Sequence, residues 1–389
     1  MSPDADVIVV GAGPAGSSTA AVLAARGVRV LLLDRATFPR DKPCGDYCNP
    51  GAVRLLRQIG SFSTVPTSDA ALISGLSVYA QDGSRFTAAF PAGPGLLVPR
   101  LRLDAALLER AGRAGAIVHE GMGVDAVRIG AESVEVRTAS DNWLSARLLV
   151  AADGAHSAIA RSLGRLTVPA RGRYTVGAYF SGFPRAAPEG ELHLGPDLYC
   201  GVAHFGGGVA NVCMALPRER WRRGGPQQVF DAALASLPVL ADAMVHARRE
   251  SAFRCAGPVG FAARDVVAAR VLLIGDAAGH LEPITGQGIF LALHSAMLAA
   301  DVASDALGAN DFSPRRLSVY ARRRGREIAG KVLASRLLQR LAFHPQLTPR
   351  LVRRLNRRAQ LASDLLGVTG DVLPPTGILS PAYLARLLL

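Results

Sequence analysis

The strongest constraint on the fold is a short apolar run, residues 6–10, followed by glycines at Gly11, Gly13 and Gly16. A β-branched run of this length predicts a buried parallel strand, and the glycine spacing lets the backbone turn tightly after it. Small residues over 15–21 then allow a helix to pack closely behind the strand. The N-terminus of that helix offers unpaired backbone N–H groups and a positive dipole end, where a pyrophosphate can bind without a side-chain cation.

A second apolar run, residues 28–33, predicts the neighbouring strand and ends at Asp34. An acid at this place can accept hydrogen bonds from the hydroxyls of an adenosine ribose. The glycine pattern alone is weak evidence, and the alternative is a glycine-rich turn in some other α/β protein. The strand before it, the helix after it and the acid at the end of the next strand together predict a dinucleotide-binding site.

The composition is that of an ordered globular protein. The chain has 389 residues, of which 49% are hydrophobic and 19% charged, so it can bury the cores of two or three domains. Its N-terminus is polar and acidic, and we find no apolar run long enough for a signal peptide or a membrane span, so we expect a cytoplasmic protein. The five cysteines are odd in number and lack CxxC spacing, which argues against a disulfide framework and against a metal site.

The formal net charge is +13 and comes almost wholly from arginine, with two clusters late in the chain. The clusters are Arg322, Arg323, Arg324 and Arg326, and then Arg350, Arg353, Arg354, Arg357 and Arg358. The second cluster recurs at helical spacing, which predicts a basic stripe on one helix face. The stripe is either a solvated face or a surface for peripheral contact with an anionic membrane or an acidic carrier. Nothing else in the chain suggests nucleic acid as a partner.

A charged loop with several prolines and glycines, residues 35–51, follows Asp34. A long irregular segment inside a compact domain is more often a binding loop than a passive connection. Its most informative residue is Cys44, although a lone cysteine is usually an inert small hydrophobe. Because Lys42 lies two residues earlier, we expect a nearby cation to lower the pKa of the Cys44 thiol and make it a candidate proton donor.

Two later segments also predict buried parallel strands. Residues 147–152 lead into Asp153, and residues 270–274 lead through a glycine into Asp276. The carboxyl ends of such strands are where ligands bind in open α/β sheets. Glycines then open a long helix at 286–289, which gives a second helix N-terminus whose backbone N–H groups can face a ligand.

The stretches between these segments alternate apolar and polar residues. Residues 61–98 and 173–260 have this pattern, which predicts strands of a second, antiparallel sheet. The second stretch includes a hairpin around 206–208 and a helix over 226–237. From Ser313 onward the chain reads as helical and rich in arginine.

Three fragments occur in a fixed order: the glycine turn with Asp34, then Asp153-Gly154, then Gly275-Asp276 with Gly286-Gln287-Gly288. In this order they resemble the FAD-binding fold of p-hydroxybenzoate hydroxylase and its relatives, over roughly residues 5–305. The resemblance implies an α/β protein in which a Rossmann-like FAD-binding domain carries an antiparallel β substrate domain and a C-terminal helical region. The implied domains are a discontinuous FAD-binding domain of 1–70, 96–170 and 262–310, a substrate domain of 71–95 and 171–261, and a helical region of 311–389.

Within that superfamily, the loop over 39–45 resembles the geranylgeranyl reductase family, which carries a Lys-x-Cys-Gly element beside the flavin. The segment 370–374 is similar to that family's C-terminal region. The chain departs from the family in its Pro-x-x-Tyr-x-Trp-x-Phe-Pro signature: Pro196 and Tyr199 are present, but Gly201 replaces the tryptophan. A glycine there opens the pocket, which puts a prenyl substrate in doubt but not the flavin chemistry. The Trp-x-Trp-x-Ile-Pro element of flavin halogenases is absent from the sequence.

The resemblance also implies which residues contact FAD. Asp34 would bind the adenosine ribose, Arg100 the phosphate and ribityl region, and Asp276 the ribityl hydroxyls. Val124 would meet the adenine edge through its backbone. The cofactor-binding residues expected in this way are Gly11, Gly13, Ala15, Gly16, Asp34, Arg35, Cys44, Gly45, Arg100, Val124, Asp153, Asp276, Gly286, Gly288 and Ile289.

Gly288 and Ile289 would bring backbone N–H groups to the flavin pyrimidine, where the helix dipole can stabilise the negative charge that develops on reduction. The catalytic candidates are Cys44 and Tyr199. No second GxGxxG follows a strand in this sequence, so NAD(P)H or another electron donor would visit only transiently and leave its hydride on the flavin.

Two activities remain open at this point. The first is an FAD-dependent reductase that transfers hydride from reduced flavin to C=C bonds of a hydrophobic, prenyl-, lipid- or polyketide-like molecule. The second is a monooxygenase that uses NAD(P)H and O2 to hydroxylate or epoxidise such a molecule. The Cys44 loop favours the first, and the missing tryptophan weakens it. A non-enzymatic flavoprotein or electron carrier is a third class.

Overall fold

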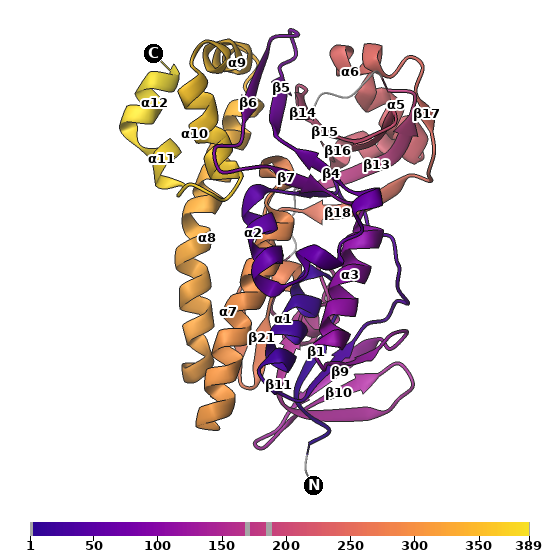
Figure 1. The fold of residues 1–389 in the computed structure, drawn as a ribbon, viewed down its shortest axis with the longest axis vertical. Coiled ribbons are helices and arrows are strands. Elements are labelled where there is room, and N and C mark those ends of the chain that lie inside the picture. The colour runs from indigo at the N-terminus through magenta and orange to yellow at the C-terminus, as the bar shows by residue number, and fades with distance from the viewer. Residues whose placement is uncertain (1–2, 168–171, 184–188, 389) are drawn as a thin grey trace.

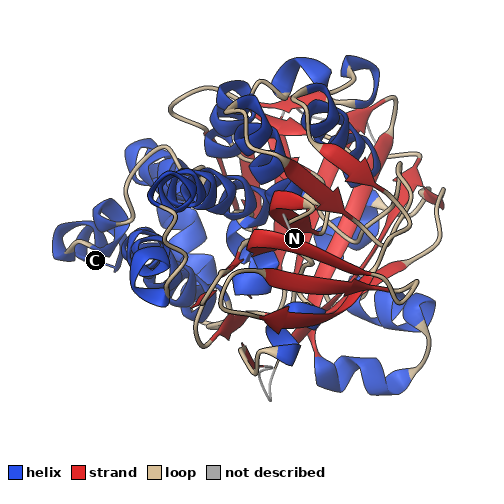
Figure 2. Cartoon of the chain, turned by 90° about the horizontal axis from the view of Figure 1, so that it is seen from below, coloured by secondary structure: helices blue, strands red, loops and turns tan. Residues whose placement is uncertain are grey.

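The computed structural model describes residues 3–167, 172–183 and 189–388. Two large sheets lie one above the other along the longest axis, and the C-terminal helices run along one side of both (Figure 1). Seen from below, these helices gather beside the strands and do not lie between them (Figure 2). The arrangement confirms the predicted α/β fold with a β-rich second layer and a helical C-terminal region.

The first sheet is built on the N-terminal strand β1 (Ala5–Val10), which pairs in parallel with β2 (Val30–Leu33) and β11 (Trp143–Ala151). Its inner strands are buried on both faces, as continuous apolar runs require. The strand order is β20-β21-β11-β1-β2-β8, with β10 and β9 extending from β11 as an antiparallel ribbon. The remaining bounds are β8 (Ile117–His119), β9 (Val124–Ile129), β10 (Val134–Thr138), β20 (Val267–Ala268) and β21 (Val271–Leu273).

Helix α1 (Pro14–Ala25) packs between α3 (Arg100–Arg113) and α7 (Gly288–Ala309). Among the described helices, α7 is long and apolar enough to cross a membrane by length and composition alone, which the sequence analysis did not expect. Most of its apolar window is buried against α1 and α8, so in this fold α7 is a core helix. Helix α3 begins at Arg100, which places this residue in its first turn.

The second sheet has the order β17-β13-β16-β15-β14-β5-β6, with β18 also pairing with β13. Every pair is antiparallel except β14 and β5, which are parallel, and the β5–β6 hairpin from the earlier 71–95 segment forms one edge of the sheet. The bounds are β5 (Gly75–Tyr79), β6 (Arg85–Ala89), β13 (Arg173–Ser181), β14 (Glu189–Leu194), β15 (Tyr199–Gly206), β16 (Val209–Pro217), β17 (Arg248–Arg249) and β18 (Arg254–Val259). We call this sheet the substrate sheet.

Shorter elements join the two layers. The helix expected over 226–237 is present as α5 (Pro226–Leu234) and ends three residues earlier than expected, and Pro238 then begins a second helix, α6 (Pro238–Ala243). Both cover the outer face of the substrate sheet. The other elements are α2 (Pro50–Ile59), α4 (Ala158–Ser162), β3 (Tyr47–Cys48), β4 (Ala71–Ile73), β7 (Gly95–Leu97), β12 (Leu166–Thr167), β19 (Phe261–Ala263), β22 (Gly279–His280), η1 (Phe62–Thr64), η2 (Thr67–Asp69), η3 (Arg218–Arg223), η4 (Gly275–Ala278) and η5 (Pro283–Thr285).

The C-terminal region is helical, as predicted. It consists of α8 (Pro314–Ala342), α9 (Leu347–Arg357), α10 (Ala359–Thr369), α11 (Thr376–Leu379) and α12 (Pro381–Leu388). Helix α8 packs along α7, whereas α9 and α10 pack against β6 of the substrate sheet. These helices and the inner face of the sheet share one hydrophobic core, separate from that of the first sheet.

A buried carboxylate fastens the C-terminal region to the first layer. Asp371 is 6% exposed and accepts hydrogen bonds from Asn49 Nδ2 and Gln287 Nε2, each over 2.7 Å, and it also pairs with Lys331. Asn49 caps α2, and Gln287 precedes the first residue of α7. Through Asp371, the 370–374 segment therefore holds the start of α7 in place.

Candidate active site

A cavity of about 820 Å³ begins at the glycine turn after β1 and continues between the substrate sheet and the C-terminal helices. Its first half is lined by the turns that follow β1, β2, β11 and β21. Its second half is lined by strands β5 and β14 and by helices α8 to α12. The carboxyl ends of the parallel strands thus meet the cavity where ligands bind in open α/β sheets.

The glycine turn has the close packing that its sequence predicts. Gly11 has φ +98°, and a Cβ there would lie 2.4 Å from the carbonyl oxygen of Ala152. A Cβ at Gly16 would lie 1.7 Å from the carbonyl oxygen of Gly11, so Gly16 serves the contact between helix and strand and does not line the cavity. Gly13 does line it, and a Cβ there would meet only the Arg40 side chain at 3.6 Å.

Asp34 supports this turn directly. Its Oδ2 accepts a hydrogen bond from the Ala12 N–H over 2.6 Å, and its Oδ1 accepts one from the Ala36 N–H over 2.8 Å. The residue is 8% exposed and lines the cavity. Each carboxylate oxygen has a second lone pair, so the side chain can order the turn and still accept ribose hydroxyls.

Several polar groups along the cavity are suited to a dinucleotide. Asp153 Oδ2 accepts from the Ala158 N–H over 2.8 Å, while its buried Oδ1 has no hydrogen-bond partner among the described residues. The buried Thr285 Oγ1 is likewise without a partner in the described part of the chain. At the start of α7, a Cβ on Gly288 would meet nothing within 4 Å, so the helix N-terminus opens to the cavity. These groups and the glycine turn fit FAD.

Three cations lie beside this half of the cavity, and Arg100 is the buried one among them. Arg100 is 6% exposed and binds Asp104 through Nε over 2.8 Å and Nη2 over 2.7 Å, while Arg40 reaches the same carboxylate over 3.0 Å. Two of the three guanidinium nitrogens of Arg100 therefore bind the Asp104 carboxylate. Lys42 Nζ lies 3.8 Å from Asp276 Oδ2. Burial alone would raise the pKa of Asp276, but His280, Lys42 and Arg100 lower it.

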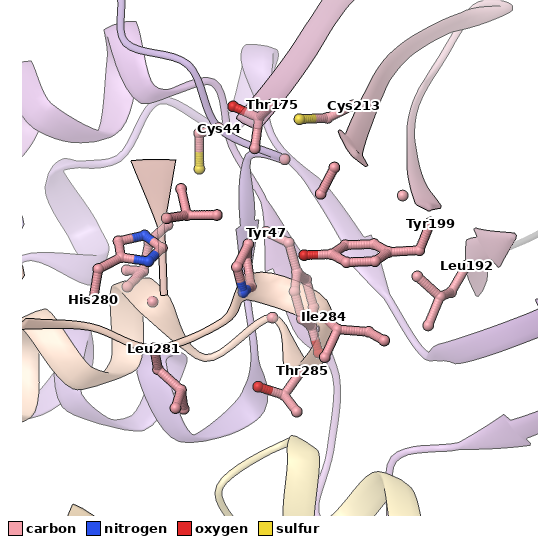
Figure 3. Close-up of a pocket in the computed structure, with 18 of the residues that line it drawn as sticks. Cys44, Tyr47, Thr175, Leu192, Tyr199, Cys213, His280, Leu281, Ile284 and Thr285 are labelled. Carbon is pink, nitrogen blue, oxygen red and sulfur yellow. The ribbon is translucent and has the colours of Figure 1, made fainter. Parts of the chain in front are cut away.

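The loop that carries Cys44 is clamped to the substrate sheet. Asn211 Nδ2 on β16 donates to the Cys44 carbonyl over 2.9 Å and to Asp46 Oδ2 over 2.5 Å. The Tyr179 hydroxyl on β13 also donates to Asp46 Oδ2, and Asp46 itself is fully buried. Cys44 is thereby held at the cavity wall, opposite Tyr199 (Figure 3).

The expectation that Lys42 activates Cys44 was wrong in direction. Burial raises the pKa of the Cys44 thiol, and although Arg100 lowers it, Asp46 raises it further. Lys42 points instead toward Asp276. The thiol is thus held protonated, and it is a weaker acid than an ordinary cysteine.

The far wall of this part of the cavity is formed by the substrate sheet. Tyr199 is 5% exposed, and in Figure 3 its ring projects toward the middle of the cavity. Its hydroxyl donates to Glu282 Oε1 over 2.9 Å. Gly201, which stands where the family signature has tryptophan, lines the cavity, and a Cβ there would meet nothing within 4 Å.

The structure brings most of the expected site residues to one cavity. The lining includes Gly11, Gly13, Ala15, Asp34, Arg35, Cys44, Gly45, Arg100, Asp153, Tyr199, Asp276, Gly286, Gly288 and Ile289. Val124 begins β9 and does not line the cavity, and neither does Gly16.

Three polar residues near the cavity escaped the sequence analysis: Asp46, Glu282 and Glu191. Asp46 follows the Cys44-Gly45 pair, and Glu282 is the one acid in the loop after Asp276. Both residues lie in loops that already carried expected site residues, so the sequence could have indicated them. Glu191 lies two residues before its partner His193 on β14, but its second partner, His204, meets it only across the β14–β15 pairing, which the sequence does not show.

The fold and the cavity together define a dinucleotide-dependent flavoprotein. The chain belongs to the FAD-binding domain family, whose sequence profile matches residues 4–333. It is an FAD-dependent oxidoreductase of the geranylgeranyl-reductase-like group, as the sequence predicted.

Two curated relatives carry reductase names. The chain is 34% identical over 382 residues to a menaquinone reductase of Mycobacterium tuberculosis, with 90% of this chain and 87% of that one covered. It is 29% identical over 347 residues to a digeranylgeranylglycerophospholipid reductase of Methanothrix thermoacetophila, with 85% of each covered. These likenesses span most of this chain and most of each relative.

Solved structures confirm the fold. A geranylgeranyl bacteriochlorophyll reductase-like protein of Thermoplasma acidophilum superposes with a TM-score of 0.80 at 21% identity, covering 94% of this chain and 96% of that one. A halogenase in complex with phloroglucinol and FAD superposes with a TM-score of 0.81 at 18% identity, covering 95% and 83%. At such identities the likeness concerns the fold alone.

Proposed function

We propose that this protein reduces carbon–carbon double bonds in the isoprenoid chain of a lipid or quinone, with FAD as its resident cofactor and NAD(P)H as a transient electron donor. FAD bound at the glycine turn and the α7 N-terminus would supply the hydride. The relatives named for menaquinone and digeranylgeranylglycerophospholipid support this substrate class, since both molecules carry isoprenoid chains.

The observation that carries the proposal is the continuity of the cavity. Beyond Tyr199 its walls are almost wholly apolar: the lining side chains there include Leu76, Val78, Leu192, Leu338, Leu341, Leu351, Val352, Leu355, Leu384 and Leu387. An apolar channel beside a hydride-transfer site excludes water and offers only dispersion contacts, which suits a hydrocarbon chain. Gly201 leaves room at the junction for a methyl-branched chain to pass.

The chain's own residues would then position the double bond. Cys44 and Tyr199 face the junction from opposite sides, as Figure 3 shows. Each carries a hydrogen that could complete the reduction. Because burial raises the pKa of both groups, neither is expected to ionise near neutral pH. The roles of these two residues are therefore part of the proposal.

The channel also suggests how the substrate arrives. Helix α9 turns Leu351, Val352 and Leu355 into the channel and exposes Arg353 and Arg357 on its other side. The exposed stripe continues with Arg350, Arg358 and, on α12, Arg386 and Leu388. We include in the proposal that this face contacts an anionic membrane surface from which the lipid enters.

A blocking substitution tests the channel. Val352→Trp places a large ring in the apolar half, so the KM for a long isoprenoid substrate should rise at least tenfold while FAD affinity is retained. Leu333→Trp is the matched control, because Leu333 is 57% exposed on α8 and lies outside the cavity lining. Equal KM values for both variants and the unmodified enzyme would remove the channel from the account.

A further inference from the structure

The Tyr199 hydroxyl donates its hydrogen bond to a carboxylate, Glu282, that lies outside the lining of the cavity. Tyr199 lines the cavity, whereas Glu282, which accepts its hydrogen bond over 2.9 Å, is absent from the described lining. Glu282 sits between β22 and η5, and its side chain is 14% exposed. The phenol of Tyr199 therefore connects the Glu282 carboxylate to the cavity.

The groups that face this pair come from four elements. Arg173 Nε on β13 lies 3.8 Å from Glu282 Oε1, Gln339 on α8 hydrogen-bonds the carboxylate, and His280 lies two residues earlier in the chain. The Cys213 thiol on β16 lies near Tyr199 and raises the pKa of its phenol. Burial raises the pKa of Glu282 above 4.5 even though Tyr199, Arg173, His280 and Gln339 lower it. Burial also raises the pKa of Tyr199, so its phenol keeps its proton.

Two hydrogen-bond arrangements of the pair are possible. When Glu282 is ionised, the Tyr199 O–H must donate to it, which holds the proton away from the cavity. When Glu282 is protonated, the carboxyl O–H can donate to Tyr199 Oη and release the phenol O–H to point into the cavity. The protonation state of Glu282 thus decides where the Tyr199 proton is directed.

We propose that Glu282 is a positioning residue which, in its protonated form, turns the Tyr199 hydroxyl toward the substrate so that Tyr199 is the proton donor in double-bond reduction. This inference rests on the proposed function. One alkene carbon gains hydride from the reduced cofactor, and the other gains the phenol proton. The Tyr199 O–H bond breaks as its proton passes to that carbon, the Glu282 O–H donates a hydrogen bond to the phenolate oxygen that remains, and solvent reprotonates Tyr199 after the product leaves.

The test is the pH dependence of one turnover, measured by mixing reduced enzyme with a polyprenyl substrate under anaerobic conditions. In the unmodified enzyme the rate should fall as pH rises through the pKa of Glu282. In Glu282→Gln the amide N–H can donate to Tyr199 Oη at every pH, so the rate should become independent of pH. At pH 8 this variant should exceed the unmodified enzyme. Tyr199→Phe should reduce product formation by roughly 10²-fold or more at all pH values, the usual contribution of one general acid.

Glu132→Gln is the matched control, because Glu132 is an exposed carboxylate in the turn between β9 and β10. It should keep the pH profile of the unmodified enzyme. A Glu282→Gln profile that still falls with pH, or a Tyr199→Phe variant with full turnover, overturns the inference. Both results would leave the proposed function standing, whereas absence of product from the unmodified enzyme would instead refute the proposed function.

A second readout does not depend on turnover. Carboxyl NMR of the FAD-loaded, 13C-glutamate-labelled protein should show one resonance that titrates above pH 4.5 and is missing in Glu282→Gln. Because the Tyr199 hydrogen bond lowers the Glu282 pKa, Tyr199→Phe should move this titration to higher pH. A Glu282 resonance that titrates identically in Tyr199→Phe would show that the two groups are not coupled and would overturn the inference.

Discussion

The side-chain amide of Asn211 donates a hydrogen bond to the backbone carbonyl of Cys44 over 2.9 Å, and so ties the substrate sheet to the loop at the cofactor end of the cavity. The same amide reaches Asp46, which is fully buried. Loop and sheet come from different parts of the chain, and this contact sets the distance between the Cys44 thiol and Tyr199 across the cavity.

Asn211→Leu removes that amide and leaves a buried carbonyl and a buried carboxylate short of one donor each. The free energy of unfolding should fall by about 1–3 kcal/mol, the usual cost of an unsatisfied buried polar group. FAD should still bind, but turnover should fall because the loop is no longer held. Urea titration and flavin content measure the two effects. Asn142→Leu, at an exposed turn, is the control, and equal stabilities of the two variants would contradict this role for Asn211.

Asp34→Ala tests whether the acid after β2 serves the cofactor as well as the glycine turn. The Ala12 and Ala36 N–H groups would lose charge-assisted hydrogen bonds, and the ribose would lose its acceptor. The FAD dissociation constant should rise by an amount equivalent to about 1.5–3 kcal/mol. Flavin fluorescence titration measures it. A variant that is less stable but has an unchanged dissociation constant would show that Asp34 only supports the turn.

The Glu191 carboxylate on β14 should give the fold a marked acid sensitivity. Burial alone would raise its pKa, but hydrogen bonds from His193 over 2.7 Å and His204 over 3.1 Å lower it to about 2. Because the folded-state pKa lies below the unfolded value of about 4.5, the stabilisation is present above pH 4.5 and is lost as pH falls toward 2.

Glu191→Gln should therefore destabilise the protein by up to about 3 kcal/mol at pH 7, with a difference that shrinks steadily below pH 4.5. Urea unfolding at several pH values from 3 to 7 measures it. A difference that stays constant over this range would mean that lost packing, not the loss of the charge, accounts for the destabilisation.

The exposed arginines of α9 should bind anionic liposomes and release them in salt. Each contributes about 1 kcal/mol near such a surface, and the attraction is screened within a Debye length. Replacing Arg350, Arg353, Arg357 and Arg358 with Gln should abolish sedimentation with these liposomes. Replacing Arg322, Arg323 and Arg326 on α8 is the control, since these arginines are also exposed but lie away from the channel. If both sets of substitutions reduced liposome sedimentation equally, net charge alone, and not the position of the α9 arginines, would account for the binding.

Most of the residues expected to contact the cofactor line the cavity, because their placement depends largely on local geometry, and their contacts with FAD stay predictions. Gly16 packs against Gly11 within one strand–turn–helix unit, and Asp34 lies at the end of the next strand. Their roles can be inferred from spacing. The family resemblance extended this to Asp276, which lies just after β21, and to Gly288, which begins α7.

The substrate half was harder to predict because its contacts join distant segments. The Tyr199–Glu282 hydrogen bond spans 83 positions, and the Asn211–Cys44 bond spans 167. The acidity of Cys44 was misjudged for the same reason: Lys42 is close in sequence, but the buried environment that raises the thiol pKa is made by the fold. The domain boundaries also remain predictions, and the one at 170/171 lies outside the described residues.

The central claim is that reduced FAD in this cavity transfers hydride to a C=C bond of an isoprenoid chain. The most direct measurement is to reduce the flavin anaerobically, mix the enzyme with a polyprenyl lipid or quinone, and follow both flavin absorbance and product mass. The account predicts that the oxidised flavin spectrum returns without O2 and that the product carries two additional hydrogens. A flavin that stays reduced until O2 is admitted, with a product that has gained an oxygen atom, would contradict the account and identify a monooxygenase.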